Sequence, residues 1–66
     1  MEIVINGKPH QVPDDMSLAH AVSLLTTSAT GVAAAINDEV VRRSVWESTR
    51  LAAGDRVEVI TAVQGG

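Results

Sequence analysis

Cysteine is absent from this 66-residue sequence, and so are phenylalanine and tyrosine. Without cysteine the chain has no disulfide, no thiolate metal ligand and no cysteine nucleophile. Trp46 is the only aromatic residue, so the chain lacks the aromatic platform on which single-stranded nucleic acids stack. These absences exclude disulfide-stapled domains, thiol-dependent enzymes and base-stacking proteins.

Basic residues are also few, with five Lys and Arg against eight Asp and Glu and a net charge of −3. The arginines, spread among acidic residues, are Arg42, Arg43, Arg50 and Arg56. Nucleic acid is therefore a poor candidate partner. The sequence has no long apolar run and opens with no basic segment followed by an apolar stretch, so we expect a cytoplasmic protein with no membrane partner.

The size of the chain limits what it can enclose. A domain of this length buries roughly 60% of the surface that its unfolded chain exposes. A substrate pocket of several hundred cubic ångströms, roughly the usual size, would take up most of so thin a core. We therefore expect the chemistry to lie at the surface or at one end, in a protein that is not an enzyme and binds no cofactor or metal itself.

The first element predicted is a β-hairpin. Residues 1–6 follow the two-residue period of a strand with one buried face. Asn6-Gly7 tolerates the positive φ angles of a type I′ turn, and residues 8–12 can return as the second strand. Pro9 donates no backbone hydrogen bond, so this second strand should lie at a sheet edge.

A single amphipathic helix of about two to three turns should follow. The Ser17 hydroxyl can accept hydrogen bonds from the amides of its first turn, and Asp14 and Asp15 favour its positive end. The core-facing stripe, at helical spacing, consists of Leu18, Ala21, Val22 and Leu25. The polar residues 26–30 are expected to form a surface loop that ends at Gly31.

The second half should form another hairpin and a long final strand. Residues 32–37 and 39–41 are expected to pair across a turn at Asn37-Asp38. Residues 44–47 have the spacing of a capping box and predict a single helical turn. The final strand is expected over residues 56–63. We expect its core face to carry Val57 and Val59, and its opposite face Glu58, Ile60 and Ala62.

This order of elements predicts an α+β protein with a ubiquitin-like β-grasp fold. Two hairpins flank one helix, and the helix needs a sheet face on which to bury its apolar stripe. The economical solution is a mixed sheet of about five strands, with the last strand beside the first. We expect residues 1–64 to form one domain and residues 65–66 to form a flexible tail.

Three groups of residues are weak candidates for a site. His10 and His20 have no His or Cys near enough in sequence to suggest a metal site, and we interpret them as solvated surface residues. Asp14 and Asp15 could act as an acid–base pair, but a position at a helix start explains both. Trp46 could anchor a partner, but a lid on the small core is the preferred interpretation.

Gly65 and Gly66 are the strong candidate. Two glycines after a strand give a tail without side chains, which can thread a narrow channel and leave a terminal carboxylate unhindered. That carboxylate is ionised at pH 7 and can attack an activated phosphate. The chain has no phosphate-binding loop of its own, so ATP should be used by a partner. The sequence indicates a protein substrate that reacts at Gly66 and docks through Ile60, Glu58 and Ala62.

Over essentially its whole length the sequence resembles the ThiS family of thiamine-pathway sulfur carriers. The resemblance is carried by residues 35–43, Trp46, residues 51–59 and residues 62–66. Its most specific part is the segment from Asn37 to Arg43 with a tryptophan nearby. The sequence differs from the family pattern at Asp38, where members often carry Gly, and at Arg42, where they often carry Pro.

The resemblance implies a route for the reaction at Gly66. A ThiF-type adenylyltransferase would adenylate Gly66 with ATP. Sulfur from a sulfur donor protein would then replace AMP and leave a C-terminal thiocarboxylate, with Gly65 in the adjoining tail. Thiazole synthase, of the ThiG type, would accept that sulfur and build the thiazole ring of thiamine.

Three other interpretations stay open at this point. The small subunit of molybdopterin synthase resembles this chain in fold, activation and Gly-Gly end, but such subunits are usually longer. A ubiquitin-like covalent modifier would form isopeptide bonds to lysines. A pure binding module would carry its Gly-Gly by accident. Intact mass after expression with an activating enzyme would distinguish a thiocarboxylate, lysine adducts and an unchanged protein.

Overall fold

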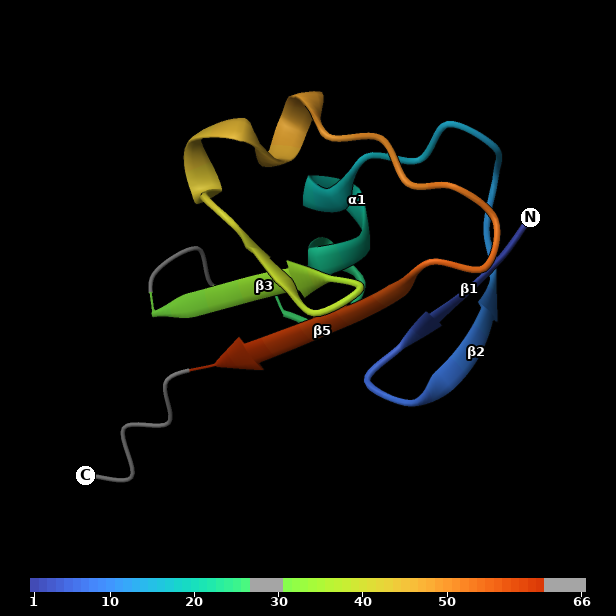
Figure 1. Cartoon of the computed structure of the whole chain (residues 1–66), viewed down its shortest axis with the longest axis horizontal. Coiled ribbons are helices and arrows are strands. Elements are labelled where there is room, and N and C mark those ends of the chain that lie inside the picture. Colours follow the sequence, from blue (N-terminus) through green and yellow to red (C-terminus); the bar gives the residue numbers. More distant parts are fainter. Residues whose placement is uncertain (27–30, 62–66) are drawn as a thin grey trace.

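A single mixed sheet with one α-helix on it makes up most of the protein (Figure 1). The computed structural model describes residues 1–26 and 31–61. In that part, the order of strands across the sheet is β2-β1-β5-β3-β4. The strands are β1 (Glu2–Ile5), β2 (Lys8–Gln11), β3 (Val32–Ile36), β4 (Glu39–Val41) and β5 (Arg56–Thr61). The predicted α+β architecture is confirmed.

Strand β5 lies at the centre of the sheet. On one side it runs parallel to β1, with Val4 opposite Arg56 and Ile5 opposite Val57. On the other side it runs antiparallel to β3, with pairs from Ile36 opposite Val57 to Val32 opposite Thr61. The expected adjacency of the last and first strands is therefore confirmed. The prediction of a strand over residues 56–63 holds as far as Thr61, and residues 62 and 63 lie outside the described residues.

Both hairpins turn through residues with positive φ. Asn6 and Gly7 have φ angles of 50° and 82°, and Asn37 and Asp38 have 50° and 72°. Type I′ turns need positive φ at both central positions, and the first such turn is confirmed. Strand β2 is the outermost strand of its edge, as the position of Pro9 predicts. The left-handed φ of Asp38 is a conformation that glycine adopts without strain.

The side chain of Asn6 extends the pairing of β1 with β5 beyond the end of β1. Its main-chain N–H donates to the Val57 carbonyl at 2.9 Å. Its Nδ2 donates to the Val59 carbonyl at 3.2 Å, while its Oδ1 accepts from the Val59 N–H at 2.8 Å. A carboxamide offers the same donor and acceptor as a peptide group. The Asn6 amide thus substitutes for the next peptide of a longer strand, and we call this pair of bonds the Asn6–Val59 clamp.

Asn37 holds the opposite side of β5 in a similar way. Its main-chain N–H donates to the Arg56 carbonyl at 2.7 Å, and its Oδ1 accepts from the Arg56 N–H at 2.9 Å. Its Nδ2 donates to Asp55 Oδ1 at 3.1 Å. Asp38, the next residue, also pairs with the Arg56 guanidinium at 3.3 Å. The start of β5 is therefore bound to the turn between β3 and β4.

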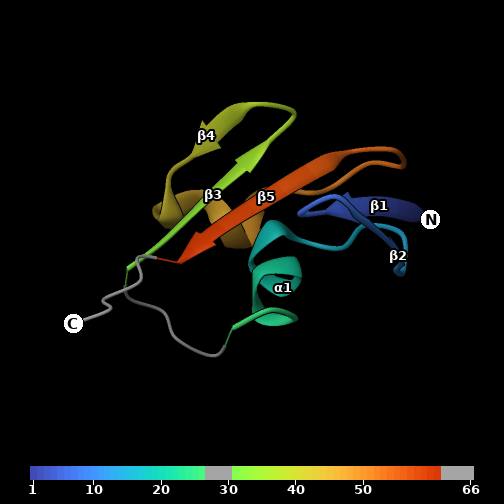
Figure 2. The ribbon, with the colours of Figure 1, turned by 90° about the horizontal axis from the view of Figure 1, so that it is seen from below.

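Helix α1 (Leu18–Ser23) packs on one face of the sheet (Figure 2). Ser17 Oγ accepts a hydrogen bond from the His20 N–H at 3.1 Å, which confirms the predicted cap. Leu18, Ala21 and Val22 are buried, but the placement of Leu25 on the buried stripe is wrong, since it is 44% exposed.

The helix is also shorter than predicted, at six residues. Its last turn tightens, because Leu24 and Leu25 donate to carbonyls three residues back, at 3.2 and 3.0 Å. A tightened turn rotates successive side chains further than an α-helix does, so Leu25 leaves the stripe. The predicted loop over residues 26–30 lies largely outside the described residues, which resume at Gly31.

Asp14 and Asp15 precede the Ser17 cap, and their favourable effect on the positive end of this helix stays a prediction. The first turn of α1 contains no acidic residue. Asp14 lies on the surface, with Oδ1 3.4 Å from the Met1 amino nitrogen. Asp15 adopts a φ of 68°, and its carbonyl accepts from the Arg50 guanidinium at 3.3 Å. Both residues belong to the turn that brings the chain to Ser17.

The segment around Trp46 is a 3₁₀ helix, η1 (Arg43–Ser48). The predicted capping box is wrong, because the cap position falls on Arg42 without a side-chain hydrogen bond and Ser44 lies inside the helix. Trp46 is 6% exposed, and its Nε1 donates to the Val41 carbonyl at 2.8 Å. The interpretation of Trp46 as a lid on the core is therefore confirmed.

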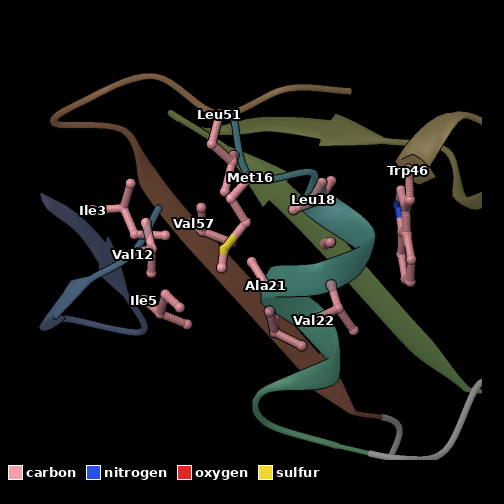
Figure 3. Close-up of a cluster of buried hydrophobic side chains, with 12 residues drawn as sticks. Ile3, Ile5, Val12, Met16, Leu18, Ala21, Val22, Trp46, Leu51 and Val57 are labelled. Carbon is pink, nitrogen blue, oxygen red and sulfur yellow. The ribbon is translucent and has the colours of Figure 1, made fainter. Parts of the chain in front are cut away.

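The core lies between the sheet, α1 and η1 (Figure 3). Trp46 lies on one side of α1, and side chains of β1 lie on the other. The buried residues are Ile3, Ile5, Val12, Met16, Leu18, Ala21, Val22, Ala34, Trp46, Leu51, Val57 and Val59. No side-chain nitrogen or oxygen among the described residues is buried without a hydrogen bond. A thin apolar core thus joins β1, β3, β4, β5, α1 and η1.

We predict that Asn6→Gly lowers the free energy of unfolding by about 1 to 3 kcal/mol, measured by urea denaturation. Glycine keeps the positive φ of the turn but removes both hydrogen bonds of the clamp. Asp38→Gly is the matched control. It removes only an exposed ion pair, so its change should stay below about 1 kcal/mol. Equal losses in the two variants would contradict the role given to the clamp.

Candidate functional site

The sheet has one covered face and one open face, and β5 contributes to both. Val57 and Val59 are 1% and 7% exposed and face α1. Glu58 is exposed and Ile60 is 65% exposed, and both project from the opposite face. The predicted faces are confirmed for these four residues. Ala62 was expected on the open face, but it lies outside the described residues.

Apolar residues of three strands meet on the open face. Ile60 of β5 pairs with Ala33 of β3, and Ala35 of β3 lies between Glu58 and Val40 of β4. Val40 is 79% exposed. Cross-strand partners lie within contact distance on one sheet face, so Ile60, Ala33, Ala35 and Val40 form one surface. We call these four residues the open-face stripe.

Sequence reasoning predicted β3 and β4 but not that their outward residues complete this stripe. Residues 32–37 are apolar at every position except Asn37, so the pattern does not show which residues face the core. The signal lies in side-chain size: Ala33 and Ala35 point outward, whereas the larger Val32 and Ile36 pack against the core. Pairing with β5, whose alternation is clear, then places Val40 outward.

Charged groups border the stripe at the start of β5. The Arg56 guanidinium lies 3.3 Å from Asp38 Oδ2, and both side chains are largely exposed. An exposed pair of this kind contributes little to stability. Its effect is to hold the guanidinium at the turn between β3 and β4. Along the open face of β5, a positive, a negative and an apolar residue therefore follow one another as Arg56, Glu58 and Ile60.

Gly65 and Gly66, the predicted reactive tail, lie outside the described residues, so their role stays a prediction. Thr61 is the last described residue, and Gly66 follows it by five positions. Five residues of fully extended chain span at most about 18 Å. Any group that reacts at Gly66 must therefore come within that distance of the end of β5.

The described residues offer no alternative site of the usual kinds. They contain no group of three or more His, Asp or Glu side chains that could hold a metal ion. His10 is half-buried in β2 opposite Ile3, and His20 is exposed on α1. Within the described ranges no helix has the length and apolar character needed to cross a bilayer. Among the described residues, the open-face stripe is the surface left to consider.

The fold and this site define a small β-grasp protein, in which the central strand leads to a Gly-Gly end. The model of the ThiS family matches residues 3–66. The chain therefore belongs to the ThiS family, a family of sulfur carriers in thiamine biosynthesis, and the resemblance seen in the sequence is confirmed. Members of this family are carriers and not catalysts.

Solved structures agree with this assignment. The crystal structure of the thiamine biosynthesis protein ThiS from Geobacter metallireducens has a TM-score of 0.82 and 30% identity, and all of both chains is covered. A solution NMR structure of a thiamine biosynthesis protein from the same organism has a TM-score of 0.80 and 29% identity, with 100% of this chain and 88% of that one covered. The ubiquitin-like β-grasp fold is thus confirmed.

Two sequence relatives share the full length of this chain. The uncharacterized protein ycf40 of Pyropia yezoensis is 35% identical over 66 residues, and that of Porphyra purpurea is 32% identical over 66 residues. In both cases the alignment covers 100% of this chain and 93% of the relative. Their names carry no function.

We predict that Ile60→Asp leaves the thermal midpoint nearly unchanged, whereas Val59→Ala lowers stability by about 1 to 3 kcal/mol. Ile60 is 65% exposed and Val59 is 7% exposed, so only the second change removes buried apolar surface. Ile60→Thr is the control for charge, because it keeps the β-branched shape that strands favour. Unfolding by Ile60→Asp with no effect of Val59→Ala would invert the assignment of faces.

Proposed function

We propose that this chain carries sulfur as a thiocarboxylate on Gly66. A ThiF-type adenylyltransferase adenylates the Gly66 carboxylate, sulfur from a donor protein replaces AMP, and the thiocarboxylate delivers sulfur to a ThiG-type thiazole synthase. The observation that carries the proposal is the match to the ThiS family, which runs through residue 66 and so includes the Gly-Gly end.

The chemistry requires an activated carboxylate. A terminal carboxylate is ionised at neutral pH, and its negative oxygen does not leave when sulfur attacks. Attack of that oxygen on the α-phosphorus of ATP forms an acyl adenylate and releases pyrophosphate. A hydrosulfide equivalent then adds to the carbonyl carbon, the bond to AMP breaks, and the thiocarboxylate remains.

The partner supplies the nucleotide site and this chain supplies the reacting group. The sequence has no phosphate-binding loop, so ATP is used by the adenylyltransferase and no cofactor is bound by the carrier. Two terminal glycines suit a narrow entry to such a site, because they present no side chain to its walls. The carrier is a co-substrate, and the enzymes are its partners.

Docking is assigned to the open face beside the chain end. Ile60 and Glu58 project there, and Ala33 and Val40 widen the apolar surface around Ile60. Exposed apolar residues with charges at the border are typical of protein interfaces. Ala62, which follows two residues after Ile60, is included in the docking surface by its position in the sequence.

We predict that deletion of Gly66 abolishes activation without changing the unfolding midpoint. The carboxylate moves back by about 3.3 to 3.6 Å, and misplacement by about 1 Å can cost a hundredfold in rate. The measurement is ATP–pyrophosphate exchange with the cognate adenylyltransferase, run beside a thermal melt. Gly65→Ala should give an intermediate loss, since its methyl group widens the tail without shifting the carboxylate. Normal exchange after the deletion would require the carrier proposal to be withdrawn.

We predict that Ile60→Asp raises KM for the carrier in the same exchange reaction about tenfold or more, which corresponds to about 1.4 kcal/mol of docking energy. The value of kcat should change little, because the tail is intact. Leu25→Asp is the control: Leu25 is also an exposed aliphatic residue, at 44%, but it follows the end of α1 and lies off the open face. Equal effects of the two variants would exclude the open face as the docking surface.

The product and the pathway can be tested separately. After expression with the adenylyltransferase and a sulfur source, intact mass should show oxygen replaced by sulfur at the carrier's end. Lysine adducts would instead indicate a protein modifier.

Growth of a strain that lacks its own thiazole sulfur carrier should be restored by this chain without added thiazole. If the chain restored only molybdopterin-dependent growth, the carrier would be assigned to molybdopterin synthesis and not to thiamine synthesis.

A further inference from the structure

The first turn of the protein contains a reactive dipeptide. Asn6 is followed by Gly7, and both are exposed. When glycine follows asparagine, its main-chain nitrogen is unhindered and can attack the asparagine side chain. Gly7 has φ 82° with nothing within 4 Å of the position of a Cβ, so the surroundings leave space around it. The same Asn6 forms the clamp on Val59, which makes its amide group important for the fold.

We propose that Asn6 is a site of spontaneous deamidation whose rate is set by opening of the Asn6–Val59 clamp. The Gly7 nitrogen attacks Asn6 Cγ, a carbon–nitrogen bond forms, and the bond from Cγ to Nδ2 breaks. The proton lost from the Gly7 nitrogen leaves with that amide nitrogen as ammonia. Water then opens the cyclic imide at either carbonyl and produces aspartate or isoaspartate.

The folded structure opposes the first step. Attack requires the Asn6 carboxamide to turn back toward its own main chain. In the clamp the carboxamide instead reaches across to β5, with Nδ2 and Oδ1 both bound to Val59 at 3.2 and 2.8 Å. Both bonds must break before Cγ can approach the Gly7 nitrogen. Opening against two hydrogen bonds should slow the reaction at least about tenfold relative to the unfolded chain.

Deamidation would also prevent the clamp from closing again. An aspartate at this position keeps an acceptor for the Val59 N–H but loses the donor to the Val59 carbonyl. Two acceptors then face each other at the former 3.2 Å contact. Isoaspartate adds a methylene to the main chain and disturbs the turn as well. The change is therefore irreversible and loosens β5 on the side of β1.

The second hairpin provides an internal control. Asn37 has the same φ of 50° as Asn6 and binds β5 with its side chain in a similar way. The residue after it is Asp38, whose Cβ hinders attack by the main-chain nitrogen. Asn37 should therefore persist where Asn6 reacts. Gly7→Asp gives the first turn the sequence of the second. In the second turn, Asp38 adopts a φ of 72° at the position that corresponds to Gly7.

The experiment follows the full-length protein at neutral pH, folded in buffer and unfolded in urea, by peptide mapping that separates aspartate from isoaspartate. In the unfolded chain, Asn6 should react faster than Asn37. In the folded protein, Asn6 should react at least about tenfold more slowly than it does in the unfolded chain. Gly7→Asp should slow the reaction of unfolded Asn6. Val59→Ala, which weakens β5 packing, should speed it in the folded protein. Equal rates at Asn6 in the folded and unfolded chains, or at Asn6 and Asn37 when unfolded, would overturn the proposal.

The structural consequence has its own measurement. Asn6→Asp reproduces one product, and it should lower the thermal midpoint and increase hydrogen exchange at the Val59 amide relative to the unmodified protein. Ser23→Asp, at an exposed position on α1, is the control for added negative charge. Unchanged exchange at Val59 in Asn6→Asp would show that the amide donor does not hold β5, and the gating role of the clamp would be withdrawn.

Discussion

The attachment of β5 on both sides is the constraint on which the rest of the structure depends. Two asparagines bind β5 through their side-chain amides, and each is the first of the two central residues of a hairpin turn. Asn6 binds Val59, and Asn37 binds Arg56. A short chain forms short strands, and β1 pairs with β5 over only two residues. The amides extend that pairing without lengthening the strand, so a sheet of small elements keeps a fixed register.

The fixed register determines which side chains of β5 enter the core and which are exposed. Alternate residues of β5 face opposite sides, so Val57 and Val59 enter the core while Glu58 and Ile60 are exposed. A slip of one residue would exchange these sets. The core would lose its valines, and the open-face stripe would lose Ile60. The Asn6–Val59 clamp and the bonds between Asn37 and Arg56 therefore determine both the packing of the core and the residues exposed on the open face.

This arrangement suits a protein that is acted upon. The described core is filled by twelve buried apolar residues, with no buried polar group among them. There is little room for a pocket in so thin a core. A sulfur carrier of the ThiS family is not itself a catalyst, so its fold does not require an enclosed active site. Under the proposed function, the carrier supplies a stable strand, a docking surface and a terminal carboxylate five residues beyond Thr61.

The sequence by itself determined the order of elements, the type I′ turn at Asn6-Gly7, the serine cap of α1 and the faces of β5, because each depends on local periodicity or on backbone preferences of Asn, Gly and Pro. The Gly-Gly end was likewise visible at once. Only the tertiary structure decided the length of α1, the exposure of Leu25, the uncapped start of η1 and the outward direction of Val40. Those features depend on contacts between distant segments. The same holds for Asn6, which the sequence marks only as a turn residue and whose partner Val59 lies 53 positions away.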